Sequence, residues 1–249
     1  MQRALTNLRA SLTRVRDIAA DIDAHAQAAL ANAAVQARHE TTLCASTVIL
    51  SGFLESFLRE VAEEMVMEIC NKAVPFNDLP PKIRVTHYWD GGQRLTAVAR
   101  RERKERPLLL TQASDVARRL ASVASNQAPY EILWEAFADT QANPGSKEIG
   151  EFLGRFHVEK PIPTLAAAMN WTENTVVLRL GSFIQVRNEC AHTGATTINI
   201  TTTDVTGYCD LIDDVATGVV NTLRATLTKP PYVPAAAPSP TPPAQPTAA

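Results

Sequence analysis

The first regular apolar pattern in the chain begins at Leu5. Apolar residues recur in alternating steps of three and four, the spacing of one helix face, at Leu5, Leu8, Leu12, Val15, Ala19, Ile22, Ala26, Ala29 and Ala33. The pattern predicts one long helix with a heptad seam. Apart from Ile22, the second half of the seam is alanine, which allows close approach of a neighbour but buries little area. A bundle helix is favoured over a coiled-coil hairpin or a dimer seam.

A second helix is predicted over residues 41–72, with Thr41 or Thr42 as its N-cap. Glu55 lies at the edge of its apolar face, where it is either the counter-charge of a buried arginine or half of an exposed pair with Arg59. The apolar face is wide, which is typical of a central bundle helix, and comprises Leu50, Phe53, Leu54, Phe57, Leu58, Val61, Met65 and Ile69.

A middle region, residues 75–163, has shorter and less regular patterns, with prolines at both ends. The run R-R-E-R-K-E-R at 100–106 has five cationic side chains and could contact nucleic acid, although its two glutamates favour a solvated helix face. Helices are predicted over residues 82–88, 112–127, 131–138 and 146–156, with turns at 91–92 and 143–145.

Thr202 or Thr203 is predicted to cap the last helix, with Asp204 in its first turn. Residues 229–249 are almost entirely Pro, Ala, Ser and Thr, which predicts a disordered, polyproline-like tail. The apolar face of the last helix comprises Val205, Tyr208, Leu211, Ile212, Val215, Val219, Leu223 and Leu227.

Together these patterns predict an all-α protein. We expect one helical domain over residues 1–228, with 75–163 as an irregular helical insertion, followed by the disordered tail over residues 229–249. The 45% content of hydrophobic residues is ample for a core.

Composition narrows the possible partners. With 24 basic and 26 acidic residues the net charge is −2, so any anion-binding site must be local. The four cysteines include no C-x-x-C pair, which argues against a structural zinc site and fits a reducing cytoplasm. Glycine-rich phosphate loops, H-E-x-x-H and G-x-S-x-G are absent, so we predict no cofactor-binding and no metal-binding residues. Neither a signal peptide nor a membrane span is predicted, and we expect a cytoplasmic protein without a membrane partner.

One segment, residues 176–194, holds an arginine where an apolar residue is expected. On an ideal helix Arg187 lies near the centre of the stripe that comprises Val177, Leu180, Ile184 and Ala191. Burial of an unpaired guanidinium is costly. This arginine is therefore either paired with a carboxylate of another helix, as a structural lock, or faces a wet cleft that binds an anion.

Arg187, Asn188 and His192 are suited to phosphodiester chemistry. An arginine can clamp a phosphate with two hydrogen bonds, and a histidine can take a proton from a ribose 2′-hydroxyl or give one to the departing 5′-oxygen. Asn188 shares a face with His192 and can orient the imidazole or bind a phosphate oxygen. Glu189 and the nearby helix end favour the protonated imidazole. These groups suffice for metal-free cleavage of RNA but not of DNA, which lacks the 2′-hydroxyl.

The helical positions of Arg187 and His192 raise a geometric problem. Five residues turn a helix by about 500°, so the two side chains point about 140° apart. Three explanations are open: the helix loosens before His192, the long arginine reaches round, or a second copy of the chain completes the site. A structural alternative for His192 is a cap at the helix end.

The segment L-x-x-x-x-x-V-R-N-E-C-A-H-T-G resembles the signature of the HEPN superfamily, an arginine, a polar residue, and a histidine four to six positions after the arginine. V-I-L-S-G-F-L-E-S-F-L-R-E is similar to the glutamate-bearing second helix of its RiboL-PSP-HEPN branch and related branches such as MAE-28990. The resemblance covers residues 41–72 and 165–228 and leaves 75–163 unplaced.

This resemblance implies an all-α bundle that dimerises so that two copies of the motif face each other. It implies a metal-independent endoribonuclease with RNA as substrate, in a toxin–antitoxin, abortive-infection or other antiviral system, with an antitoxin or regulatory partner. Arg187 and His192 would carry catalysis, with Asn188 as polar helper and Glu55 as supporting acid. Some members of the superfamily do not cut RNA, so the alternative is a non-catalytic nucleotide-binding or antitoxin-like protein.

Overall fold

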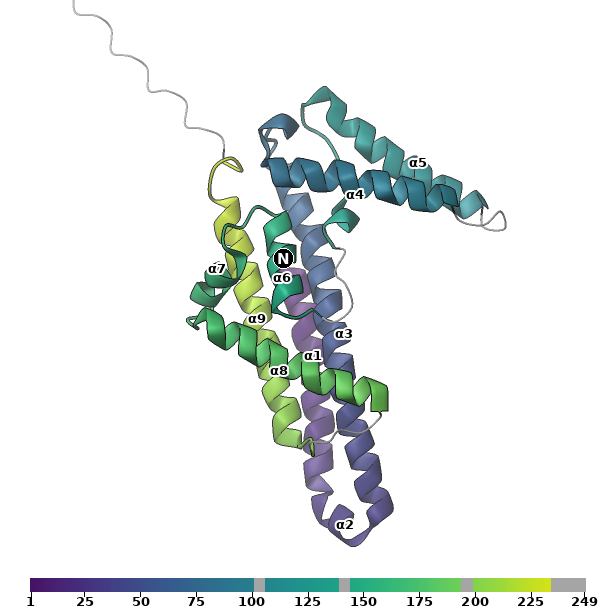
Figure 1. Ribbon diagram of the computed structural model, residues 1–249, viewed down its shortest axis with the longest axis vertical. Helices are drawn as coiled ribbons and strands as arrows, with labels where there is room; N and C mark the ends of the chain where they lie inside the picture. Colours follow the sequence, from purple (N-terminus) through teal and green to yellow (C-terminus); the bar gives the residue numbers. More distant parts are fainter. Residues whose placement is uncertain (101–105, 139–143, 194–198, 234–249) are drawn as a thin grey trace, which may run out of the picture.

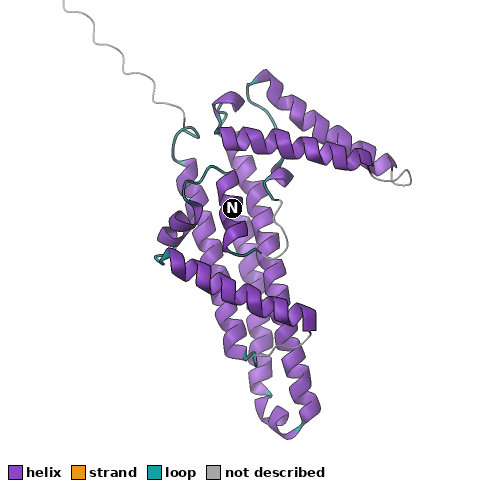
Figure 2. Ribbon diagram, in the orientation of Figure 1, coloured by secondary structure: helices purple, strands orange, loops and turns teal. Residues whose placement is uncertain are grey.

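A computed structural model describes residues 1–100, 106–138, 144–193 and 199–233 of the chain. The described residues form helices, turns and loops without a strand, which confirms the all-α prediction (Figure 2). One hydrophobic core runs through them, from the first helix to the residues that follow the last one.

The centre of the fold is a bundle of three long helices, α1 (Gln2–Ala24), α3 (Ala33–Asn71) and α9 (Thr202–Leu227). They run side by side along the longest dimension of the molecule (Figure 1). Within α1 and α9 the predicted apolar faces are confirmed, except that Ile22 and Tyr208 are half-buried. The buried residues of α1 are Ala4, Leu5, Leu8, Leu12, Val15 and Ala19.

The predicted single helix from Leu5 to Ala33 is wrong in its second half. The chain leaves α1 after Ala24, forms the short α2 (Ala26–Ala31) and turns back into α3, so α1 and α3 form a helical hairpin. The Asn32 side chain caps α3 by accepting hydrogen bonds from the backbone N–H groups of Ala34 and Val35, at 2.9 and 3.4 Å. The alanines of the seam would bury little apolar area in a longer α1. This burial is too small to outweigh the start of α3 that Asn32 caps.

Helix α3 therefore begins eight residues before the predicted start at Thr41. The hydroxyls of Thr41 and Thr42 do not cap it. Each donates a 2.8 Å hydrogen bond to the carbonyl oxygen four residues earlier, of Ala37 and Arg38. Threonine is compatible with a helix interior when its hydroxyl is satisfied in this way.

The wide apolar face predicted for α3 is buried, except that Phe53 is half-buried. By length and composition α3 could also cross a membrane, a property that it shares with central helices of bundles, and half of its most apolar window is buried inside the fold. The apolar residues of α3 without exposed surface are Leu50, Leu54, Leu58, Val61, Ala62, Met65 and Ile69.

The middle region forms longer helices than predicted. Helix α4 (Pro81–Arg100) runs through residues 91–92, which the sequence predicted as a turn, and pairs with α5 (Arg106–Ser122) in a hairpin that projects from the bundle (Figure 1). Gly91 serves close packing instead: a Cβ atom there would lie 2.7 Å from side-chain carbons of Leu120 and Leu133. Residues 101–105 of the charged run lie outside the described residues.

The predicted helix at 131–138 is also wrong. This segment contains only the 3₁₀ turn η4 (Trp134–Ala136), which packs against α3 and α4. Farther along, α6 (Ser146–Arg155) has Gly145 at its N-cap position, and α7 (Pro161–Ala168) begins at one of the prolines that end the middle region. Proline is tolerated in the first turn of a helix, where its missing N–H is not needed.

Helix α8 (Glu173–Thr193) crosses the bundle and carries the arginine–histidine motif (Figure 1). The N-cap of helix α9 is Thr201, and not Thr202 or Thr203 as predicted, with Asp204 completing a capping box. Residues 229–233 belong to the folded part, contrary to the predicted tail boundary. Tyr232 is 1% exposed, and its hydroxyl donates a 3.0 Å hydrogen bond to the carbonyl oxygen of Phe156. The predicted tail from residue 234 onward lies outside the described residues.

Candidate active site

The buried face of α8 is rotated from the predicted stripe. Val177 is 41% exposed and Ala191 is exposed, so Arg187 lies on the flank of the buried face and not at its centre. The sequence left this angle open, because the apolar residues of α8 cover a wide arc and not a narrow stripe. The buried residues of α8 are Val176, Leu180, Phe183, Val186 and Cys190.

Arg187 is half-buried, and no acid among the described residues neutralises its charge. Its Nη1 donates a 3.2 Å hydrogen bond to Oδ1 of Asn188, while its Nε is buried without a hydrogen-bond partner. Within the described ranges Arg187 forms no ion pair. The interpretation of Arg187 as a buried structural lock therefore finds no support, and the guanidinium retains donors for an anion.

Asn188 and Glu189 lie on the same turn of α8 as Arg187. Asn188 accepts from Arg187, which leaves its amide nitrogen as a donor. Glu189 accepts a 3.4 Å hydrogen bond from Nε2 of Gln185 on the preceding turn. The amide of Asn188 thus fixes one arm of the guanidinium, and both groups can face a phosphate from the same side.

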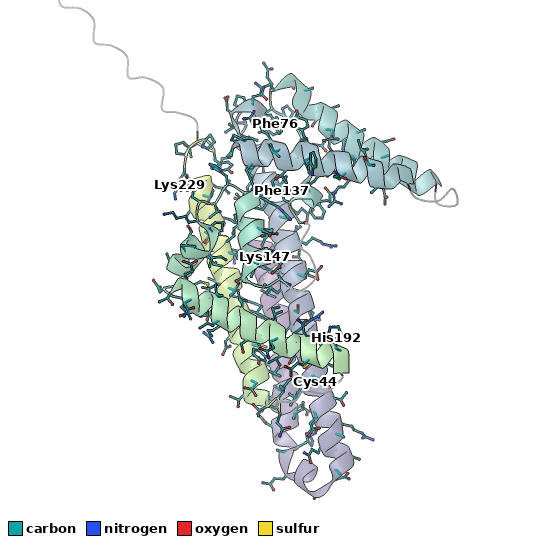
Figure 3. All side chains as sticks on the ribbon, viewed as in Figure 1. Cys44, Phe76, Phe137, Lys147, His192 and Lys229 are labelled. Atoms are coloured by element: carbon teal, nitrogen blue, oxygen red, sulfur yellow. The ribbon has the colours of Figure 1, made fainter. Side chains whose placement is uncertain are left out.

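His192 is exposed near the end of α8, as Figure 3 shows. The helix continues as α-helix to Thr193 and does not loosen before the histidine. Arg187 and His192 therefore keep their angular separation of about 140°. Of the three explanations open from the sequence, the long reach of the arginine and completion by a second copy remain.

Cys190 fixes this turn of α8 to α3. Cys190 and Val186 form a small apolar cluster with Cys44 of α3, separate from the main core. Cys44 is labelled in Figure 3. Burial, with a contribution from Cys44, raises the pKa of Cys190 to about 12. The thiol stays protonated at neutral pH, so it is a packing group and not a nucleophile. No local sequence pattern could predict this contact, because it joins residues far apart in the chain.

Glu55 lies half-buried on α3, away from the cluster that holds α8. It is eleven residues from Cys44, about 16 Å along the helix axis. No hydrogen bond or ion pair within the described segments joins Glu55 to Arg59, Arg187 or His192. The expected counter-charge is therefore not formed inside one chain, and the alternative pair with Arg59 is not formed either.

In the segments that the structure describes, no three His, Cys, Asp or Glu side chains come together in a way that could hold a metal ion. The candidate site consists of the polar groups of α8.

A protein-family model matches most of the chain. The family model described as RiboL-PSP-HEPN matches residues 10–225, which include the candidate site and the middle region that the motif resemblance left unplaced. No curated protein matches the chain. No solved structure matches it either.

Proposed function

Because the chain belongs to the RiboL-PSP-HEPN family, we propose that it is a metal-independent endoribonuclease whose chemistry is carried by Arg187 and His192. One observation supports this most strongly. A half-buried guanidinium without an acidic partner lies five residues before an exposed histidine on one rigid helix. A site that keeps an arginine charged and unpaired suits an anionic ligand such as a phosphodiester.

The proposed reaction is internal attack by the ribose 2′-hydroxyl. Arg187 binds the non-bridging phosphate oxygens, with Asn188 as the polar helper. The imidazole of His192 takes the 2′-hydroxyl proton as the 2′-oxygen attacks phosphorus, and returns that proton to the 5′-oxygen as the bond from phosphorus to that oxygen breaks. Glu189 supports the charged imidazole, and Glu55 is the proposed supporting acid. The products are a 2′,3′-cyclic phosphate and a 5′-hydroxyl.

The angle between Arg187 and His192 leads us to propose a homodimer. The arginine of one copy and the histidine of the other would then act on one phosphate. Helix α8 offers a surface for such contact: Leu178 is 62% exposed, Val177 is 41% exposed, and the position of Gly181 has open space around it. Exposed apolar side chains beside a glycine allow two helices to approach closely.

The proposed biological role is that of a toxin or an antiviral or abortive-infection effector in the cytoplasm, without a membrane partner and held in check by an antitoxin or regulatory partner. The four cysteines are free thiols, which suits a reducing compartment. A non-catalytic nucleotide-binding or partner-binding role is the second candidate. One observation favours it: within the described residues no hydrogen bond orients the His192 ring.

The test is cleavage of single-stranded RNA by the purified protein in EDTA, with analysis of the product ends. We expect 2′,3′-cyclic phosphate ends and no cleavage at a position that carries a single 2′-deoxy substitution. His25→Ala is the matched control, because His25 is also an exposed histidine at a helix end. A requirement for a divalent metal, or cleavage that persists after 2′-deoxy substitution, would contradict the proposal.

A further inference from the structure

Helix α4 turns an apolar and aromatic face to solvent. Trp89 is 68% exposed, the most of any large hydrophobic residue in the described part of the chain, and Tyr88 is 48% exposed. They line an open groove of about 510 Å³, together with Asn77, Pro81, Arg84 and Val85. The α4 residues recur at helical spacing, so the groove follows one face of the helix.

The opposite face of α4 is anchored, which fixes the direction in which the groove points. Ile83 and His87 are fully buried there. Nδ1 of His87 accepts a 3.2 Å hydrogen bond from the backbone N–H of Leu133. The groove face therefore cannot rotate inward without breaking this contact.

The groove is cationic as well as aromatic. Arg84 lines it, its Nε is buried without a hydrogen-bond partner, and neither Arg84 nor the adjacent, exposed Lys82 forms an ion pair in the ranges that the structure describes. None of the residues that line the groove is acidic. An anion with an apolar face matches these groups better than a neutral chain does.

Charge along the sequence points the same way. Residues 81–122, which span α4 and α5, hold ten of the 24 Lys and Arg residues but only four of the 26 Asp and Glu residues, a net charge of +6 against −8 for the rest. Arg118 and Arg119 are neutralised by Asp115 and by glutamates of the following loop. Among the described residues of α4, Lys82 and Arg84 therefore keep a positive charge without an acidic partner.

We infer that the α4 groove is a binding platform for single-stranded RNA, separate from the candidate site on α8. Bases of a single strand stack on Trp89 and Tyr88, and Arg84 holds the backbone phosphate. A duplex hides its base faces and cannot stack in this way. The inference takes RNA as the anion from the proposed function. The proline-rich tail of the chain is a weaker occupant, because residues 234–249 carry no charged side chain to use Arg84.

The test uses the His192→Ala variant, so that the RNA stays intact, and a fluorescein-labelled oligouridylate of about twelve nucleotides. Fluorescence anisotropy should show that Trp89→Ala weakens binding about tenfold or more, while Trp89→Phe retains most of it. Arg84→Gln should reduce the dependence of binding on salt. Met67→Ala, which changes a 57% exposed apolar residue of α3, is the matched control and should bind like the parent.

Equal binding by the parent and the Trp89→Ala variant would overturn the inference, and so would equal affinity for a duplex of the same length. A peptide of residues 234–249 that competes with the RNA and binds more tightly would assign the groove to the tail instead. The binding assay needs no cleavage, so it separates the two proposals. Trp89-dependent binding by a protein that never cuts RNA would contradict only the proposed function, whereas cleavage with Trp89-independent binding would contradict only the platform.

Discussion

Arg187 donates a 3.2 Å hydrogen bond from its Nη1 to Oδ1 of Asn188, its immediate neighbour on α8. The acceptor is a neutral amide, so the contact positions the guanidinium without cancelling its charge. A carboxylate in the same place would hold the arginine more tightly and occupy the donors that a phosphate needs. With a neutral amide as its partner, Arg187 keeps both its charge and donors for a phosphate.

Replacing His192 by Ala should abolish RNA cleavage without unfolding the protein. A general acid–base group contributes about 10²–10⁴-fold to a rate, so we expect a loss in that range or greater. Because His192 is exposed, the free energy of unfolding should stay within about 0.5 kcal/mol of the wild-type value. Cleavage assays and thermal melts of the same preparation measure both. A His192→Ala protein that cuts RNA at the wild-type rate would rule out a catalytic histidine.

Replacing Arg187 by Leu should remove activity and leave stability nearly unchanged. The wild-type side chain buries an Nε without a partner and forms no ion pair within the described residues, so an apolar side chain loses little. We expect the free energy of unfolding to change by less than about 1 kcal/mol. Arg187→Lys should also be nearly inactive, because an ammonium cannot form the two-armed contact with phosphate. A large loss of stability in Arg187→Leu would instead indicate a structural ion pair.

Replacing Leu178 by Arg should convert the proposed dimer into a monomer and reduce cleavage. Leu178 is 62% exposed on the α8 face assigned to the second copy, and a charge there would have to be desolvated on association. Light scattering coupled to size-exclusion chromatography measures the mass, with Met67→Arg on α3 as the control. A wild-type protein that is monomeric and fully active would refute the dimer.

Acid should lower the free energy of unfolding through His87, which anchors α4 to Leu133. Burial lowers the pKa of His87 from its ordinary value of 6.5 to about 4, so the folded protein keeps the ring neutral while the unfolded chain binds a proton at pH 6.5. The contribution of neutral His87 to the free energy of unfolding is fully present above pH 6.5. It falls by about 3 kcal/mol between pH 6.5 and 4.

The matched variant for this prediction is His87→Asn. Its amide oxygen can accept the hydrogen bond that Leu133 donates to Nδ1, but the side chain cannot gain a proton. Chemical denaturation at several pH values should give a shallower loss of stability for His87→Asn than for the wild type. Identical pH dependence in the two proteins would show that His87 does not set it.

The sequence predicted those features that depend on local spacing. The buried faces of α1 and α9 follow the repeat of apolar residues. The start of α9 was predicted to within two residues, although Thr201 caps it in place of Thr202 or Thr203. Arg187, Asn188 and His192 were found in the same way, because all three lie within two turns of one helix.

The remaining features depend on partners distant in sequence. Gly91 marks a turn by local rules, but in the fold it lets α4 approach Leu120 and Leu133. The contact of Cys190 with Cys44, and the rotation that moves Arg187 to the flank of α8, are set by how α8 lies across α3. The exposed Trp89 was missed because the predicted turn at 91–92 ended the helix beside it.

The central claim is that an arginine and a histidine from two chains act on one phosphate. It is tested most directly by mixing Arg187→Ala and His192→Ala proteins, each inactive alone, after dissociation and reassociation, and by measuring 2′,3′-cyclic phosphate ends in EDTA. Half of the random dimers are mixed and each has one intact site of two, so we predict about a quarter of wild-type activity. A mixture that exchanges subunits and stays inactive would contradict the account.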